Sequence, residues 1–204
     1  MIKNIIFDMG NVLIRFDQQY FINRLGVYGD DVTLLKREVF MSLEWVRMDR
    51  GALNEEEAFR LIAPRLPQRL HDVAWKLICM WDRPILPIDG MYELVEELKG
   101  KGYGIYLLSN ASVRQHEYWP RIEASRFFDG TLISADHHVL KPQREIYELC
   151  LETFGLKAEE CFFVDDAPAN IEGAMYCGIS GAVFHGDAAL LRSQLRAAGV
   201  PVAE

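Results

Sequence analysis

The stretch Lys3-Asn4-Ile5-Ile6-Phe7-Asp8-Met9-Gly10-Asn11-Val12-Leu13 decides the expected fold of this chain. The apolar run Ile5-Ile6-Phe7 is typical of a buried strand in a parallel sheet, and it ends directly at the carboxylate of Asp8. In an open α/β sheet, ligands bind in the crevice at the carboxyl ends of the strands. We therefore expect Asp8 to be a nucleophile or a metal ligand, unless it only caps the following turn.

The sequence after residue 83 alternates between helical and strand patterns. Amphipathic or capped segments predict helices over residues 89–100, 112–124, 142–155 and 168–177, with Pro142 in the first turn of the third helix and Gly155 at its end. Apolar runs predict strands over residues 105–108, 130–133, 161–164 and 179–184. This alternation predicts an α/β fold with a doubly wound parallel sheet and right-handed crossovers.

Residues 16–82 interrupt the alternation because they contain helical patterns and no convincing strand. The patterns cover residues 18–25, 32–48 and 54–61, with glycines and prolines between them. Such a segment directly after the first strand is typical of an inserted subdomain, although a long crossover without a function of its own would have the same pattern. We expect a core of residues 1–15 and 83–204 and an α-helical cap of residues 16–82.

The composition of the 204 residues is that of an ordinary soluble globular protein, 50% hydrophobic and 25% charged. The net charge of −8 argues against non-specific binding of nucleic acid, and no window approaches the roughly 20 apolar residues of a membrane span. Four cysteines without CxxC spacing and the lack of a signal-peptide pattern favour the cytoplasm. The protein could be a monomer or a homodimer, and the sequence does not decide between them.

Polar residues follow the later strands just as Asp8 follows the first one. They are Ser109 and Asn110 after residues 105–108, Lys141 before the helix at Pro142, and Asp165, Asp166 and Asn170 after residues 161–164. Parallel strands would bring all of these side chains to the sheet edge that holds Asp8. Each one alone has an ordinary explanation as a helix cap or a solvated charge, but together they predict a functional site.

The chemistry of this set points to a phosphate bound with a metal. Two or three carboxylates beside a single lysine would raise one another's pKa unless a cation neutralised them. Oxygen-only ligands favour Mg²⁺, which keeps several waters and shares its coordination shell with a substrate phosphate. The Ser109 hydroxyl and the Lys141 ammonium could hold the remaining phosphate oxygens. Positioning and charge neutralisation are the main requirements of phosphoryl transfer.

The ordered motifs resemble those of the haloacid dehalogenase (HAD) superfamily. They are Asp8, Ser109-Asn110, Lys141-Pro142 and Asp165-Asp166 with Asn170, and the helical insert resembles the small cap of that superfamily. Within it, the chain is most similar to bacterial sugar phosphatases of the α-D-glucose-1-phosphate phosphatase type, and more distantly to the N-terminal phosphatase domain of soluble epoxide hydrolases. The phrases around Asp8 and over residues 166–174 carry this closer resemblance. The resemblance implies a HAD-like Rossmannoid core.

The resemblance also implies roles for the motif residues. Asp8 would accept the phosphoryl group as an aspartyl-phosphate that water hydrolyses. Mg²⁺ would be held by the Asp8 and Asp166 side chains and the Gly10 backbone carbonyl, with Asp165 beside it. The other implied roles are binding of the phosphoryl group by Ser109, Asn110, Lys141 and Asn11, and support of the aspartates by Asn170.

Gly10 departs from the family pattern, because most phosphatases of the superfamily have their general acid and base, an Asp, at this position. General acid–base catalysis is typically worth ~10²–10⁴-fold. Three hypotheses follow from this departure. In the first, the leaving group needs little protonation, and in the second, another residue, such as Asp17 or a residue of the cap, supplies the proton. In the third, the chain is a catalytically weak ligand-binding or regulatory protein. A hexose 1-phosphate suits the first hypothesis, because an anomeric hydroxyl is more acidic than an ordinary alcohol. The expected partner is thus a small phosphorylated metabolite.

The cap is expected to select the substrate. Its candidate residues are Glu44, Trp45, Arg47 and Arg50. The arginines could bind a second anion or sugar hydroxyls and the tryptophan could stack on a sugar face, although ordinary packing or a solvated helix face would explain any one of them. His116, His137, His138 and His185 lack the spacing of metal ligands.

Two further enzyme classes remain open. A metal-independent 2-haloacid dehalogenase would use the same nucleophile on carbon, and Asp165 and Asp166 argue against it because it would not need them. A phosphomutase would have to protect its aspartyl-phosphate from water and return the phosphoryl group to its product.

Overall fold

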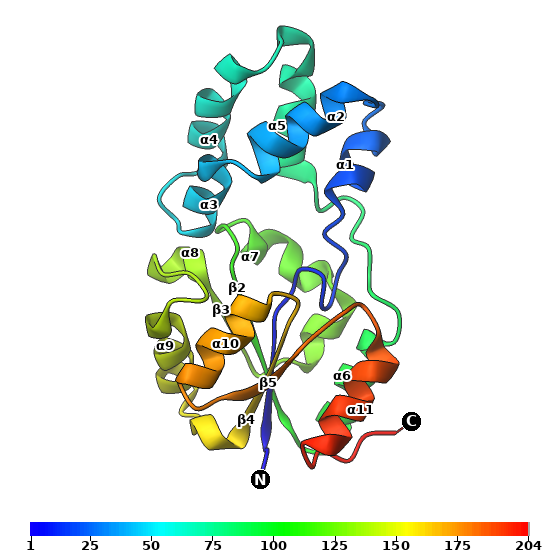
Figure 1. The fold of residues 1–204 in the computed structure, drawn as a ribbon, viewed down its shortest axis with the longest axis vertical. Helices are drawn as coiled ribbons and strands as arrows, with labels where there is room; N and C mark the ends of the chain where they lie inside the picture. The colour runs from blue at the N-terminus through cyan, green and yellow to red at the C-terminus, as the bar shows by residue number, and fades with distance from the viewer. Residues whose placement is uncertain (204) are drawn as a thin grey trace.

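Five strands form one parallel sheet in the computed structural model, which describes residues 1–203 (Figure 1). The strands are β1 (Asn4–Phe7), β2 (Gly104–Ser109), β3 (Gly130–Ile133), β4 (Cys161–Asp165) and β5 (Ser180–Val183). Their order across the sheet is β3-β2-β1-β4-β5, so that β1 lies in the middle. All four neighbouring pairs are parallel, and their carboxyl ends therefore meet at one edge.

Helices cover both faces of this sheet, as the doubly wound prediction requires. Successive residues of a strand point to opposite faces, and Ile5 and Phe7 belong to one buried cluster while Ile6 belongs to another. The face of Ile5 packs against α6 (Met91–Gly100) and α11 (Ala188–Ala197), and the face of Ile6 packs against α9 (Arg144–Phe154) and α10 (Pro168–Tyr176). Figure 1 shows these two pairs on opposite sides of the strands. The predicted α/β class and sheet are confirmed.

Two helices after residue 83 differ from the prediction. The segment 112–124 is not one helix, because α7 (Gln115–Tyr118) is followed by 3₁₀ turns over Trp119–Arg121 and Glu123–Phe127. Pro120 explains the interruption, since it has no N–H for the helical ladder. The helix predicted from Pro142 begins only at Arg144, because the backbone at Gln143 is extended. The short helix α8 (Ser134–His137) and α11 have no counterpart in the prediction.

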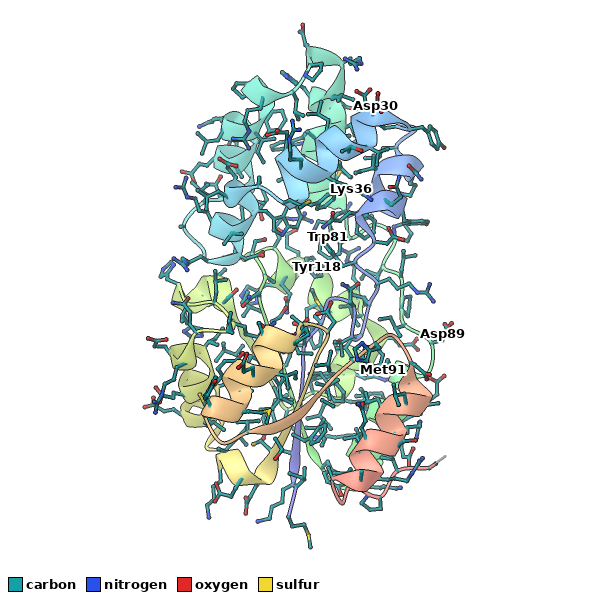
Figure 2. All side chains as sticks on the ribbon, viewed as in Figure 1. Asp30, Lys36, Trp81, Asp89, Met91 and Tyr118 are labelled. Carbon is teal, nitrogen blue, oxygen red and sulfur yellow. The ribbon has the colours of Figure 1, made fainter. Side chains whose placement is uncertain are left out.

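The segment between β1 and α6 is helical throughout its regular elements and lies over the carboxyl ends of the strands (Figure 1). Its helices are α1 (Gln18–Arg24), α2 (Asp30–Leu35), α3 (Leu43–Asp49), α4 (Glu55–Ile62) and α5 (His71–Met80). Asp30 and Lys36 lie in this helical unit and Met91 lies in the sheet-containing unit, with Trp81 and Tyr118 between them (Figure 2). We call residues 16–82 the cap and the remaining residues the core.

The single helical pattern predicted over residues 32–48 is wrong. Helix α2 passes into a π-helical turn at Lys36–Phe40, and a separate helix, α3, begins after Ser42. Ser42 has an extended backbone, and its hydroxyl accepts a hydrogen bond from the Trp45 N–H at 3.1 Å. A serine that caps a helix in this way offers the backbone an alternative to continuing the previous one.

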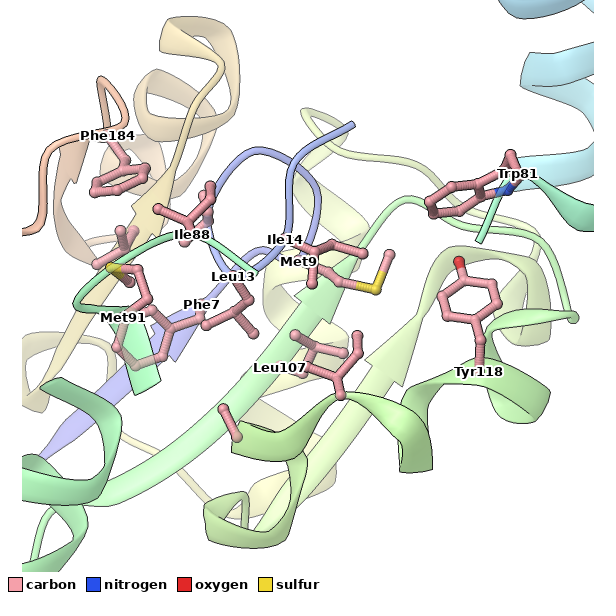
Figure 3. Packing of buried hydrophobic residues seen from close by; sticks show 14 of the residues in the cluster. Phe7, Met9, Leu13, Ile14, Trp81, Ile88, Met91, Leu107, Tyr118 and Phe184 are labelled. Carbon is pink, nitrogen blue, oxygen red and sulfur yellow. The ribbon is translucent and has the colours of Figure 1, made fainter. Parts of the chain in front are cut away.

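Aromatic side chains join the two chain connections between cap and core. Phe16 precedes α1 and Trp81 follows α5, and their rings meet edge to face with centroids 4.9 Å apart. Trp81 also packs on Tyr118 of the core, with ring centroids 5.2 Å apart (Figure 3). Phe7, Leu13, Ile88 and Met91 belong to the same buried cluster and lie farther from Trp81, within the core (Figure 3). The two connections are thus in direct contact.

The residue after Trp81 is a fully buried acid, Asp82. Its carboxylate accepts hydrogen bonds from Arg114, at 2.8 Å, and from Arg121. Both arginines belong to the core, so that this ion pair fixes the return of the chain from the cap.

The longest helix in residues 1–203 is α9, with 11 residues. Within those residues no helix combines the length and the apolarity that a membrane crossing requires.

Candidate active site

The three central strands bring Asp8, Ser109 and Asp165 together at the carboxyl edge of the sheet. Asp8 directly follows β1, while Ser109 and Asp165 are the last residues of the neighbouring strands β2 and β4. The Asp8 N–H donates to the carbonyl of Val164 at 2.8 Å, which fixes the backbone of the carboxylate against β4. All three residues are less than 10% exposed. The parallel register therefore explains the gathering that the sequence pattern predicts.

Lys141 reaches into this edge as a buried cation. Its Nζ donates to Asp8 Oδ1 at 2.7 Å, to Asp165 Oδ2 at 2.7 Å and to the carbonyl of Leu108 at 2.8 Å. Burial opposes the charge of the ammonium, but the two carboxylates outweigh it and raise the pKa of Lys141 above its usual value. Lys141 is thus a charged group held between two acids.

Asp8, the candidate nucleophile, has a strongly raised pKa. Burial raises the pKa of Asp8 to about 7, Lys141 opposes the rise, and the neighbouring Asp165 adds to it. Burial likewise raises the pKa of Asp166. One lysine therefore does not compensate three acids, and the ionised site lacks positive charge.

Asp165 and Asp166 are adjacent in sequence but have different surroundings. Asp165 is completely buried and accepts from the Ala167 N–H at 2.8 Å and from the Asn170 amide at 2.9 and 3.0 Å, in addition to Lys141. Asp166 is half-buried, and within residues 1–203 the one side-chain group that donates to it is the Asn11 amide, at 3.0 Å. The oxygens of Asp165 are occupied by protein donors, whereas those of Asp166 are largely available.

The donor set fits a hard divalent cation. Asp8, Asp165 and Asp166 each offer a carboxylate oxygen, and these oxygens lie within 4.8 Å of one another. Oxygen ligands of this kind and a deficit of positive charge are what Mg²⁺ requires. Gly10, whose carbonyl the resemblance makes a ligand, lines the same cavity.

Ser109 and Asn110 contribute to the site in different ways, one through its hydroxyl and the other through the backbone of Lys141. The hydroxyl oxygen of Ser109 is buried and has no hydrogen-bond partner within residues 1–203, so that it is available to a bound group. The side chain of Asn110 is engaged with the backbone of Lys141: Oδ1 accepts from its N–H at 2.8 Å and Nδ2 donates to its carbonyl at 3.0 Å. Asn110 also lines the cavity, and its amide holds the loop that carries Lys141.

A cavity of about 190 Å³ lies above Asp8, between core and cap. Its core wall includes Asp8, Gly10, Asn11, Ser109, Asn110, Ser112, Tyr118, Lys141 and Asn170, and its other wall consists of Phe16, Trp45, Met48, Asp49, Glu55, Ile78 and Trp81. Aromatic and apolar side chains dominate the second wall, with Asp49 and Glu55 as its acids. No arginine or lysine of the cap is part of the lining.

Of the four specificity candidates in the cap, Trp45 alone lines the cavity. Glu44 is buried and accepts from Arg65 Nη2 at 2.7 Å, an ion pair within the cap. Arg47 and Arg50 are exposed, and Arg50 approaches Gln143 at 3.5 Å. The helical pattern over residues 32–48 includes Glu44, Trp45 and Arg47, and Arg50 directly follows α3. The pattern did not indicate which of these residues face the core.

Asp17, the other predicted source of a proton, also lies outside the lining. It is exposed, and its carboxylate caps α1 by accepting from the Tyr20 N–H at 2.9 Å. His116 pairs with Asp136 at 2.9 Å, and His138 contacts the carbonyl of Arg50 at 3.0 Å. No histidine lines the cavity.

Asp49 is a site residue that the sequence analysis did not single out. It is the last residue of α3, and burial together with the nearby charge of Asp8 raises its pKa well above the ordinary value. The local sequence contains only one hint, the break after Arg50 at Gly51, which brings the end of the helix down onto the core.

The family model of haloacid dehalogenase-like hydrolases matches residues 2–178. Among curated proteins, the chain is 27% identical to the sesquiterpene phosphatase astK of Aspergillus oryzae, over 88% of each sequence. It is also 27% identical to the D-ribitol-5-phosphate phosphatase of Bacteroides thetaiotaomicron, over 84% of this chain and 86% of that protein.

Among solved structures, the fold is similar to that of a HAD family enzyme from Bacteroides thetaiotaomicron, in complex with magnesium and inorganic phosphate. The TM-score is 0.70 with 22% sequence identity, and the match covers 94% of this chain and 99% of the other. At this identity the likeness concerns the fold.

Proposed function

The chain belongs to the haloacid dehalogenase-like hydrolases, and we propose that it hydrolyses a small phosphate monoester through an aspartyl-phosphate on Asp8. The observation that carries this proposal is the trio Asp8, Asp165 and Asp166, whose carboxylate oxygens lie within 4.8 Å of one another beside Lys141. Three acids with one cation suit the phosphoryl group of a metal-bound substrate better than a halogenated carbon atom, which needs no cation. The relatives named as phosphatases support the same class.

The protein residues act by position and charge. Asp8 Oδ attacks phosphorus, and the phosphoryl oxygens bind to Lys141 and to the Ser109 hydroxyl, which has no partner among residues 1–203. Asn110 keeps Lys141 in place through both backbone groups of that residue. Asn170 fixes the Asp165 carboxylate, so that its charge orients Lys141. Water then hydrolyses the aspartyl-phosphate and releases inorganic phosphate.

Mg²⁺ would be held by the carboxylates of Asp8 and Asp166 and the carbonyl of Gly10. Asp165, whose oxygens accept from Ala167, Asn170 and Lys141, would lie beside the ion. When bound, the cation neutralises the charge of the carboxylates and of the phosphoryl group. The magnesium and phosphate of the similar Bacteroides enzyme support this assignment.

The cap closes the cavity and selects the leaving group. A volume of about 190 Å³ suits a small metabolite, since sites for drug-sized ligands measure roughly 300–1,000 Å³. Glu55 repels a second anion and no arginine or lysine of the cap lines the cavity to bind one, while Trp45 and Trp81 offer flat apolar faces. We propose an uncharged leaving group, such as the sugar of a hexose 1-phosphate or a sugar alcohol like the one in the name of the Bacteroides relative.

A terpenoid phosphate is the second candidate substrate. The aromatic wall formed by Phe16, Trp45 and Trp81 favours it, as does the name of the Aspergillus relative. A chain of many carbon atoms would need a larger space than the cavity of about 190 Å³ offers.

Hydrolysis of 4-nitrophenyl phosphate by the purified protein with Mg²⁺ tests the reaction class. We expect slow turnover that a chelator and the Asp8→Asn substitution both abolish. A panel of sugar, sugar-alcohol and prenyl phosphates then identifies the substrate. If no ester of the panel releases phosphate, the phosphatase proposal is wrong, and a ligand-binding or regulatory role is left.

The same preparation separates the other enzyme classes. Release of chloride from 2-chloropropionate in the presence of a chelator would indicate a dehalogenase. Interconversion of sugar phosphates that depends on a sugar bisphosphate would indicate a phosphomutase.

A further inference from the structure

The leaving group of an alkyl or sugar phosphate needs a proton when its bond to phosphorus breaks, because an alkoxide, even that of a more acidic anomeric hydroxyl, is too basic to depart alone. Gly10 has no side chain to supply one, and Asp17 faces solvent as a helix cap. Among residues 1–203, the acids that line the cavity are Asp8, Asp49 and Glu55. Since Asp8 is the nucleophile of the proposed reaction, the two acids of the cap remain as proton donors.

These two acids differ in how they are bound. Glu55 accepts a hydrogen bond from the Ser112 hydroxyl at 2.8 Å. Within residues 1–203, the carboxyl group of Asp49 has no ion-pair partner and no hydrogen bond from another side chain, and only the backbone N–H of Ser112 approaches it. Asp49 is also close enough to Asp8 and Lys141 for their charges to act on it. Its carboxyl group is therefore the freer of the two and lies near the reacting centre.

The backbone around Asp49 is fixed to the core although the residue belongs to the cap. The Ser134 hydroxyl donates to the carbonyl of Asp49, and His138 Nδ1 contacts the carbonyl of Arg50 at 3.0 Å. Gly51 approaches Ala135 so closely that an added Cβ would lie 2.2 Å from its carbonyl oxygen. These three contacts hold the end of α3 against the core, so that Asp49 has a defined position above the site.

We propose that Asp49 is the proton donor to the leaving group in the phosphatase reaction, in place of the side chain absent at Gly10. The inference rests on the proposed function. As an Asp8 oxygen bonds to phosphorus, the bond between phosphorus and the leaving oxygen breaks, and that oxygen takes the proton of the Asp49 carboxyl group. The products of this step are an alcohol, the aspartyl-phosphate and the Asp49 carboxylate.

The second half of the reaction restores the proton. A water oxygen bonds to phosphorus, the bond from phosphorus to Asp8 breaks, and the water gives one proton to the Asp49 carboxylate. Inorganic phosphate leaves, and both carboxyl groups return to their starting forms. Burial, which raises the pKa of Asp49, favours the protonated form that the first half requires.

The leaving-group dependence of kcat/KM tests this assignment, because kcat/KM reports the steps up to cleavage of the bond to the leaving oxygen. We expect Asp49→Asn to lower kcat/KM about 10²-fold or more for sugar and alkyl phosphates. For 4-nitrophenyl phosphate, whose leaving group is stable without a proton, the loss should be under about 3-fold. A substitution that merely damaged the fold would lower both by the same factor.

Two further variants make the test specific. Glu55→Gln removes the other cap acid of the cavity and should change both kinds of substrate by a similar factor. Gly10→Asp places a carboxyl group two residues after the nucleophile, where a Cβ has only the Cβ of Phe16 within 4 Å, at 3.9 Å. In the Asp49→Asn background it should restore at least a part of the lost kcat/KM for alkyl phosphates.

The possible results separate the two proposals. If the wild-type protein does not hydrolyse 4-nitrophenyl phosphate, the proposed function fails. If the wild-type protein hydrolyses it, two results would show that the assignment of Asp49 is wrong while the phosphatase proposal stands. One is an equal loss of kcat/KM for all esters in Asp49→Asn. The other is a steeper dependence of kcat/KM on the leaving group in Glu55→Gln alone. A selective loss on alkyl esters that Gly10→Asp repairs supports the assignment.

Discussion

Asn110 binds Lys141 by both backbone groups, with Oδ1 accepting from the Lys141 N–H at 2.8 Å and Nδ2 donating to its carbonyl at 3.0 Å. The two residues come from different connections of the sheet, one after β2 and one before α9. This pair of bonds holds the backbone from which the ammonium reaches Asp8, Asp165 and the carbonyl of Leu108.

Substitution of Asn110 should therefore impair Lys141. We expect Asn110→Ala to lower kcat at least about 10-fold, since a small displacement of a positioned group is costly in catalysis. Asn110→Asp keeps the acceptor and loses the donor, so that its kcat should lie between those of wild type and Asn110→Ala. Steady-state kinetics on 4-nitrophenyl phosphate measure both variants, and equal rates for all three proteins would contradict the role.

The shifted acidity of Asp8 predicts how stability depends on pH in the absence of divalent cations. The pKa of Asp8 is about 7 in the folded protein, because burial and Asp165 raise it against the effect of Lys141, and 3.8 is its ordinary value. Between these values the folded state binds a proton that the unfolded state lacks, so that the free energy of unfolding falls as pH rises to about 7 and is level above it.

Urea unfolding of wild type and Asp8→Asn with a chelator, between about pH 5 and pH 8, measures this effect. The stability of wild type relative to the variant should decrease with pH across that range. Mg²⁺ should reduce the decrease, because it binds the ionised carboxylates. A difference that does not change with pH would show that Asp8 has an ordinary pKa.

The contact of Gly51 with Ala135 predicts a selective effect on the cap. Gly51 and Gly26 both have positive φ, +70° and +80°, but only Gly51 has heavy atoms within 4 Å of an added Cβ. Alanine at either position should cost roughly 1–2 kcal/mol of stability because of its backbone conformation. Gly51→Ala should in addition lower kcat/KM at least several-fold, because its Cβ displaces the end of α3 from the core.

Thermal unfolding and kinetics of these two variants provide the comparison. An equal loss of activity in Gly26→Ala and Gly51→Ala would mean that the docking of α3 is not needed for turnover.

Asp82 predicts a large effect on stability. Its carboxylate is fully buried between Arg114 and Arg121, and the Arg114 side chain is itself only 11% exposed. Removal of one partner of a buried ion pair costs about 3–5 kcal/mol, since the other charge stays buried without compensation. Asp82→Asn should lose stability on this scale in urea unfolding.

Asp72→Asn is the matched control for Asp82. Asp72 pairs with Lys76 at 2.6 Å on an exposed surface of α5, and such pairs contribute less than about 1 kcal/mol. Similar losses for the two substitutions would contradict the special role of Asp82 at the cap connection.

The sheet and the strand-end residues were predictable because their signals are local. An apolar run followed at once by a polar residue indicates both a buried strand and the end at which it stops, and Asp8 and Asp165 each have this pattern. Parallel pairing then brings such ends together without further information. The motifs at these strand ends also carry the family resemblance, which the family model confirms.

The wall formed by the cap was not predictable in the same way. Glu44 and Asp49 are both acids of α3, yet one pairs with Arg65 inside the cap and the other lines the cavity above Asp8. The choice depends on how α3 packs against the core, through contacts such as the one between Ser134 and Asp49. No periodicity within the helix contains that information. The hydrogen bonds between the Asn110 side chain and the backbone of Lys141, 31 residues away, could not be predicted for the same reason.

The contact between Phe16 and Trp81 has a mechanical consequence. These rings belong to the two connections about which the cap would have to turn, and both also line the cavity above Asp8. The side chains that join the two connections are therefore also part of the cavity wall. A substitution of Phe16 or Trp81 would change the surface offered to a bound molecule and the contact between the two connections at the same time.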